Sequence, residues 1–148
     1  MEIRKIIGVL FITVSLITFG IFITRTEFSI QLQAWISFKY YMQFAPQVVS
    51  IMLFSSGIYL IRRYPKSNFA LAIFGYSIIE LIALDLLGVV SNSFGAIATI
   101  LFGCCAIIAM WVAHSNSFNL KKLSWVQVLI SILIGALESL VLYQLYSK

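Results

Sequence analysis

Residues 58–76 of the chain read IYLIRRYPKSNFALAIFGY. Two apolar runs without charges meet here at a short turn that contains arginine, proline and lysine. Such a stretch predicts a helical hairpin whose arms cross a lipid bilayer and whose basic turn lies on the cytoplasmic side. Pro65 is expected to end the first arm, and Asn68 is well placed to cap the second.

Apolar runs of similar length continue on both sides of this hairpin. Together they predict five spans, at residues 6–24, 44–61, 69–90, 94–113 and 125–146. Each is close to the ~20 residues that a helix needs to cross the hydrocarbon core of a bilayer. The composition agrees, because 61% of the residues are hydrophobic and only 10% are charged, unlike a soluble domain. We therefore predict an all-α membrane protein in which residues 1–148 form a single polytopic domain of five transmembrane helices.

The positions of the basic residues predict the orientation. Seven of the ten lie before the first span, between the second and third, or between the fourth and fifth: Arg4, Lys5, Arg62, Arg63, Lys66, Lys121 and Lys122. These three places share one side of the membrane only if the chain crosses it five times. Because cytoplasmic connections are enriched in Lys and Arg, we predict a cytoplasmic N-terminus and an outer C-terminus, in the inner (plasma) membrane. The positive charges then fix the orientation in the membrane and contact anionic lipid head groups. We expect no nucleic-acid binding.

One connection, residues 25–43, is longer than the others and is predicted on the outer side. Residues 28–39 alternate between apolar and polar, which is typical of a strand. A lone strand beside a membrane has no pairing partner, however, and Phe28, Leu32, Trp35 and Ile36 also share one side of a helix. A short helix in the membrane interface therefore explains the pattern equally well. Either form is an amphipathic segment that rests on lipid or contacts a partner.

Carboxylates inside the predicted spans are the strongest functional signal. Glu80, Asp85 and Glu138 lie within spans that carry no Lys or Arg. An ionised side chain is costly in hydrocarbon, so such acids are usually functional or paired. From the helical rise, Glu80 lies about 18 Å from the cytoplasmic end of its span and Glu138 about 20 Å from the start of its own. Their spans run in the same direction, so as neighbours the two acids could meet near mid-membrane and share a proton.

These three acids are the candidate residues for binding a proton, an ion or a partner. Asp85 has a simpler alternative, because it lies near the outer head groups where water can solvate it. Glu80 and Glu138 could instead be protonated and hydrogen-bonded across helices. The polar residues expected to line a path or a contact beside them are Ser77, Gln127, Ser131 and Ser139.

Small residues predict where the helices pack. Gly95, Thr99 and Gly103 recur every four residues in the fourth span, and Gly135 lies in the fifth. Because lipid supplies no hydrophobic drive between helices, contact faces in membranes are built from such residues. We expect these positions to pack within the bundle, with self-association as the alternative.

Catalytic motifs are missing from the sequence. Cys104 and Cys105 are adjacent, which excludes a C-x-x-C pair, and His114 is the only histidine. We therefore predict no enzyme and no catalytic, cofactor or metal site. The preferred function is a small non-catalytic accessory, assembly or immunity-type subunit that binds another membrane protein. The alternative is an oligomeric proton- or cation-coupled carrier or channel for a small solute, which uses the intramembrane carboxylates.

Overall fold

The computed structural model describes residues 2–30, 40, 43–88 and 94–146, with the backbone alone for residues 138–146. This described part is entirely helical and contains no strand. Its α-helices are α1 (Ile3–Arg25), α4 (Ala45–Ile61), α5 (Ser67–Leu86), α6 (Ala96–Ser115) and α7 (Trp125–Tyr146). The prediction of an all-α fold is confirmed.

Three helices are long and apolar enough to cross a membrane, namely α1, α5 and α6. The helix α4 is also apolar but has 17 residues, and the apolar part of α7 with described side chains is Trp125–Leu137. These helices are consistent with a membrane location. Five crossings and their orientation remain predictions.

Helix ends differ from the predicted spans at two glycines. The third span was expected to reach residue 90, but α5 ends at Leu86 and Gly88 follows with a φ of 69°. The fourth was expected from residue 94, but Gly95 has a φ of 75° and α6 begins only at Ala96. Positive φ is easy for glycine and interrupts a right-handed helix. Most of the connection 25–43 lies outside the described residues, so the choice between strand and helix stays open there.

The expected cap at Asn68 is wrong. The helix α5 begins one residue earlier, at Ser67, and its N-cap is Lys66. Asn68 is buried, and its amide donates to Oδ1 of Asn116 at 2.9 Å and to the carbonyl of Lys121 at 3.1 Å. The Asn68 side chain, which was expected to cap α5, instead joins the start of α5 to the connection between α6 and α7.

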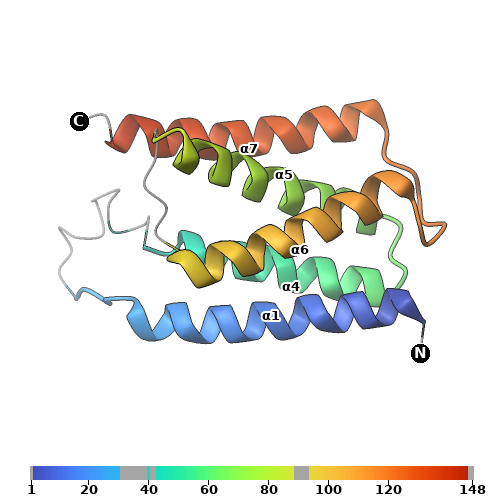
Figure 1. Ribbon diagram of the computed structural model, residues 1–148, viewed down its shortest axis with the longest axis horizontal. Coiled ribbons are helices and arrows are strands. Elements are labelled where there is room, and N and C mark those ends of the chain that lie inside the picture. The colour runs from blue at the N-terminus through green and yellow to red at the C-terminus, as the bar shows by residue number, and fades with distance from the viewer. Residues whose placement is uncertain (1, 31–39, 41–42, 89–93, 147–148) are drawn as a thin grey trace.

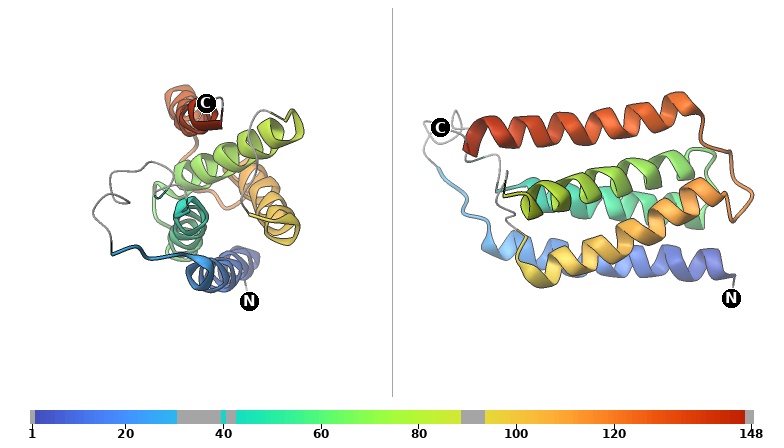
Figure 2. Two further views of the ribbon diagram at one scale, coloured as in Figure 1. Left: turned by 90° about the vertical axis from the view of Figure 1, so that its left-hand side faces the viewer. Right: turned by 45° about the horizontal axis from the view of Figure 1, so that its top comes forward.

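The helices run alternately back and forth, so the two termini lie at opposite ends of the bundle (Figure 1). The helix α1 packs along α4, while α5 contacts α4, α6 and α7. Seen along the bundle, α7 stands at the edge beside α5 (Figure 2). Fully buried Phe11, Leu53, Phe74 and Phe102 fill the centre.

The helices α1 and α4 approach each other closely at two glycines. A Cβ at Gly57 would lie 2.8 Å from the carbonyl oxygen of Gly8, and a Cβ at Gly8 would lie 3.0 Å from that of Gly57. Only glycine fits at such a backbone contact. Further along, the hydroxyls of Thr18 and Ser50 are buried and hydrogen-bonded to each other at 3.0 Å.

At the other end of this pair, Arg4 is buried against the last turn of α4. Its guanidinium donates to the carbonyls of Leu60 and Ile61, and to the Glu2 carboxylate at 2.9 Å. Carbonyls at a helix C-terminus lack intrahelical donors and carry partial negative charge, so the cation stabilises them. The hydrogen bond from Arg4, followed by the attraction of Arg63, lowers the pKa of Glu2.

Candidate functional site

The two helices that carry the central acids are neighbours. The helices α5 and α7 both run from the end of the bundle where the chain begins toward the opposite end, and they pack side by side (Figures 1 and 2). The condition under which Glu80 and Glu138 could meet is therefore fulfilled by the packing of their helices. The side chains of Glu138 and Ser139 lie outside the described residues.

Glu80 lies directly against α7. A Cβ at Gly135 would overlap the Glu80 carboxyl group, with 2.8 Å to its carbon atom Cδ. The missing side chain of Gly135 thus leaves the space that the carboxyl group occupies. Glu80 is half-buried and stands about 20 Å along α5 from its start, about two thirds of the way to the end of the helix at Leu86.

Two serines lie one helical turn before this contact, on the same two helices. Ser77 precedes Glu80 by three residues, and Ser131 precedes Gly135 by four, so both lie at a similar height in the parallel pair. Both are buried. The Ser131 hydroxyl donates to the carbonyl of Gln127 at 2.8 Å, whereas Oγ of Ser77 has no hydrogen-bond partner among the described residues.

Gln127 has a structural role at the start of α7. Its Oε1 accepts from the backbone amide of Ser124 at 3.0 Å, and Oγ of Ser124 accepts from the amide of Gln127 at 3.2 Å. This reciprocal pair is a capping box, which satisfies amides that the helix leaves without acceptors. The pattern Ser-x-x-Gln before an apolar run could have been recognised in the sequence.

Asp85, the third predicted acid, lies apart from this contact. It stands near the end of α5, five residues beyond Glu80, and is half-buried. Five residues correspond to about 7 Å along a helix and to a different face. The structure therefore brings Glu80, Ser77 and Ser131 to one helix pair and leaves Asp85 nearer the end of the bundle.

The predicted packing residues of α6 have different surroundings from one another. Gly95 is the exposed N-cap of α6, and Oγ1 of Thr99 donates to its carbonyl at 3.0 Å. Gly103 faces α5, since a Cβ there would lie 3.3 Å from Cδ1 of Ile82. The face of α6 that is buried is formed by other residues, namely Phe102, Cys105, Ala106, Ala109, Val112 and Ala113.

One polar contact was missed by the sequence analysis. The hydroxyl of Tyr76 on α5 and Nε2 of His114 at the end of α6 lie 3.1 Å apart, and the two rings meet edge to face. Tyr76 is the tyrosine that lies inside a predicted span rather than at an end, which was the only sequence signal for it. The described residues contain no group of three or more His, Cys, Asp or Glu that could hold a metal ion.

The candidate site is thus the contact between α5 and α7, where the carboxyl group of Glu80 lies over Gly135 with buried Ser77 and Ser131 one turn away. We compared the chain with models of protein families, with curated proteins and with solved structures, and none of these comparisons found a match.

Proposed function

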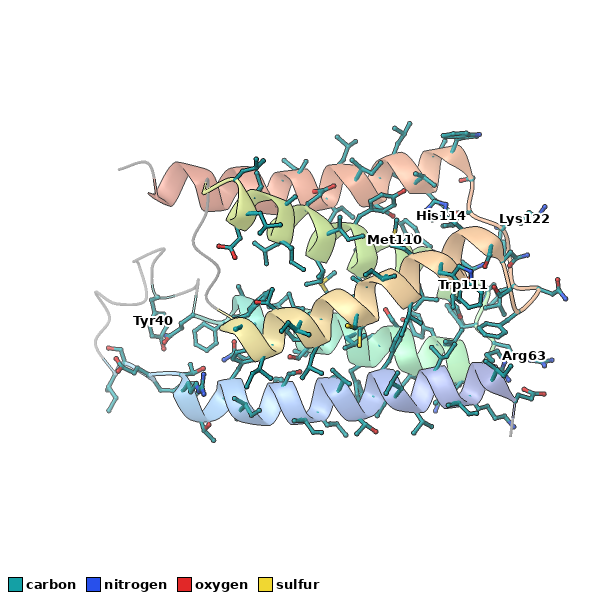
Figure 3. The ribbon with its side chains drawn as sticks, in the orientation of Figure 1. Tyr40, Arg63, Met110, Trp111, His114 and Lys122 are labelled. Atoms are coloured by element: carbon teal, nitrogen blue, oxygen red, sulfur yellow. The ribbon has the colours of Figure 1, made fainter. Side chains whose placement is uncertain are left out.

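We propose that this chain is a non-catalytic, multi-pass protein of the inner (plasma) membrane that binds another membrane protein as an accessory, assembly or immunity-type subunit. In this proposal all five helices cross the bilayer, with the N-terminus in the cytoplasm and the C-terminus outside. The alternating direction of the helices supports that arrangement (Figure 1). So does the gathering of Arg63 and Lys122 at the end of the bundle where the chain begins, since positive residues favour the cytoplasmic side (Figure 3).

The observation that carries the proposal is the position of Glu80. This half-buried residue lies about two thirds of the way along α5, and its carboxyl group contacts a helix that stands at the edge of the bundle. A half-buried acid in an apolar helix is costly in a bilayer, whether it is ionised or neutral. A helix of a partner protein placed beside α5 and α7 would complete the burial of this residue.

The outer surface of α7 is suited to such a contact. Large apolar side chains cover it and are exposed, namely Trp125, Val126, Leu129, Leu133 and Leu137. The helix packs chiefly against α5, so most of its circumference is open to another helix. The exposed apolar face of α1 serves as a comparison, because it is of similar extent but belongs to a helix that packs chiefly against α4.

Site-specific photo-crosslinking in the native membrane tests the proposal. A photoreactive phenylalanine analogue at Leu133 of α7 should yield a defined adduct with one other membrane protein, and the same analogue at Ile17 of α1, similarly exposed, should not. Changing Glu80 and Glu138 together to glutamine should weaken that adduct and the co-purification of the partner. Glu27→Gln, which alters an exposed acid at a helix end, is the matched control. The proposal would be refuted if the analogue gave equal adducts at Leu133 and Ile17. It would also be refuted if the double change of Glu80 and Glu138 left the adduct at Leu133 unaltered.

A second candidate function is favoured by Ser77. Its buried hydroxyl has no hydrogen-bond partner among the described residues and lies one turn from Glu80. Such a group can bind a proton-carrying water or a cation, as a proton- or cation-coupled carrier or channel requires. In liposomes, the reconstituted protein would then move protons or a cation, and Glu80→Gln would abolish the flux while Glu27→Gln would leave it unchanged. Flux that persists in Glu80→Gln would exclude this role for the acid.

A further inference from the structure

A half-open cavity of about 370 Å³ lies away from the α5–α7 contact, between the last turns of α1 and the first turns of α6. Its size falls within the roughly 300–1,000 Å³ of typical small-molecule sites. The lining combines an apolar floor with a single cation, Arg25. Both parts of this lining restrict what the cavity can bind.

The floor of the cavity is aromatic and buried. Phe22 and Phe94 line the cavity with their ring centroids 6.1 Å apart, and each is 5% exposed. Phe102 supports both from the core, with ring centroids 5.3 Å from Phe94 and 6.4 Å from Phe22. Rings that pack on one another in this way do not close easily over an empty space, so the floor stays available to an apolar occupant.

The walls open toward the surface that would face lipid. Ile21 of α1 and Ile97 of α6 line the cavity and are exposed on the outside of the bundle. Ala98 and Leu101 continue the wall along α6. An acyl chain can therefore enter from the side, between the two helices, without crossing a polar barrier.

The rim is positive. Arg25 is exposed in the last turn of α1, and both ion pairs among the described residues belong to Glu2, so no described carboxylate neutralises Arg25. The opposite rim is the first turn of α6, whose N-cap Gly95 offers no side-chain acceptor to the free amides. A guanidinium group binds phosphate through several N–H donors at once.

We propose that this cavity binds one anionic phospholipid, with its phosphate at Arg25 and an acyl chain on the floor of Phe22 and Phe94. The apolar floor distinguishes this occupant from a free phosphate ion, which would use the rim alone. The cation distinguishes it from a neutral hydrocarbon chain. The site rests on the membrane location of the chain and is independent of the α5–α7 contact.

Native mass spectrometry of the purified full-length protein tests the site, with phosphatidylglycerol, phosphatidylcholine of the same acyl chains, and glycerol phosphate as probes. One equivalent of phosphatidylglycerol should bind more tightly than phosphatidylcholine, and glycerol phosphate should not bind. Arg25→Gln should weaken phosphatidylglycerol binding about tenfold, through loss of a charge-assisted hydrogen bond. Lys122→Gln, a matched loss of one exposed charge at the other end of the bundle, should not (Figure 3).

The floor is tested with a change of volume. Ala98→Leu should fill the cavity and weaken the binding of both phospholipids, whereas Ala83→Leu, at an exposed alanine of α5, should leave it unchanged. Equal affinity for the two phospholipids in the unmodified protein and in Arg25→Gln would overturn the proposal. Binding of glycerol phosphate as tight as that of the lipid would also overturn it, since the floor would then contribute nothing. Neither result would bear on the partner contact at Glu80, which is read out by crosslinking.

Discussion

The α1–α4 pair and the α5–α7 pair use glycine for opposite purposes. Gly8 and Gly57 face each other, so the two backbones of the first pair touch. Gly135 in the second pair faces the carboxyl group of Glu80. The first contact stabilises the bundle by close packing, while the second gives space to an ionisable group within an apolar helix. A glycine in an apolar helix is therefore informative only together with what it faces.

The largest effect on stability is expected where the backbones of α1 and α4 touch. Gly57→Leu should lower the free energy of unfolding by about 3 kcal/mol, because even its Cβ would lie 2.8 Å from the carbonyl oxygen of Gly8. Unfolding in mixed detergent micelles measures it. Gly20→Leu is the control, since a Cβ at Gly20 has no neighbour within 4 Å. Similar losses at the two glycines would show that the close approach is not what stabilises the pair.

A smaller effect is expected where glycine meets a side chain. Gly135→Ala should lower the free energy of unfolding by about 1 kcal/mol, because the new methyl group would overlap the Glu80 carboxyl group. The loss is small because the long side chain of Glu80 can turn away. In a double-mutant cycle with Glu80→Ala, the two changes should be non-additive by at least about 0.5 kcal/mol, since truncating Glu80 frees the space that the methyl group needs. Additive losses would mean that the two residues do not touch.

The end of α4 offers a gain in stability. Arg63 has a φ of 54°, and the bonds from its amide to the carbonyl of Leu60 and from Tyr64 to Tyr59 form the usual C-terminal motif in which glycine is preferred at this position. Arg63→Gly should raise the free energy of unfolding by about 0.5 kcal/mol, after the loss of the exposed ion pair to Glu2. Arg62→Gly, at a φ of −78°, should lower it instead. If both substitutions lowered the free energy of unfolding, the assignment of backbone strain to Arg63 would be wrong.

The smallest effect is expected at the exposed carboxyl group that joins α1 to α4. The hydrogen bond from Arg4 lowers the pKa of Glu2 below its ordinary value of 4.5. A carboxyl group with a lowered pKa contributes stability above its ordinary pKa and loses it as the pH falls through the folded-state value. The difference in thermal stability between the unmodified protein and Glu2→Gln should therefore be present at neutral pH and vanish as the pH falls well below 4.5. If the difference in thermal stability did not change with pH, the charge of Glu2 would have no role in it.

Much of the fold was predictable from the sequence, since apolar length and breaker residues are local signals. The fifth predicted span, 125–146, coincides with α7. The roles of single polar residues were harder to predict. Gln127 was expected to line a path or a contact, but it forms a capping box. Asn68 was expected to cap α5, but it joins the start of α5 to the connection between α6 and α7. Both can serve either role locally, and the choice depends on which acceptors the fold brings near.

The sequence by itself determined that the chain is helical and that Glu80 lies within an apolar helix. A helix satisfies its own backbone hydrogen bonds, so its existence follows from a run of suitable residues. Tertiary structure alone decided that α5 lies beside α7 and that Gly135 rather than a bulky side chain meets Glu80. These helices are apolar on nearly every side, so hydrophobicity does not distinguish their faces. Only the fit between residues distant in the sequence selects which faces meet.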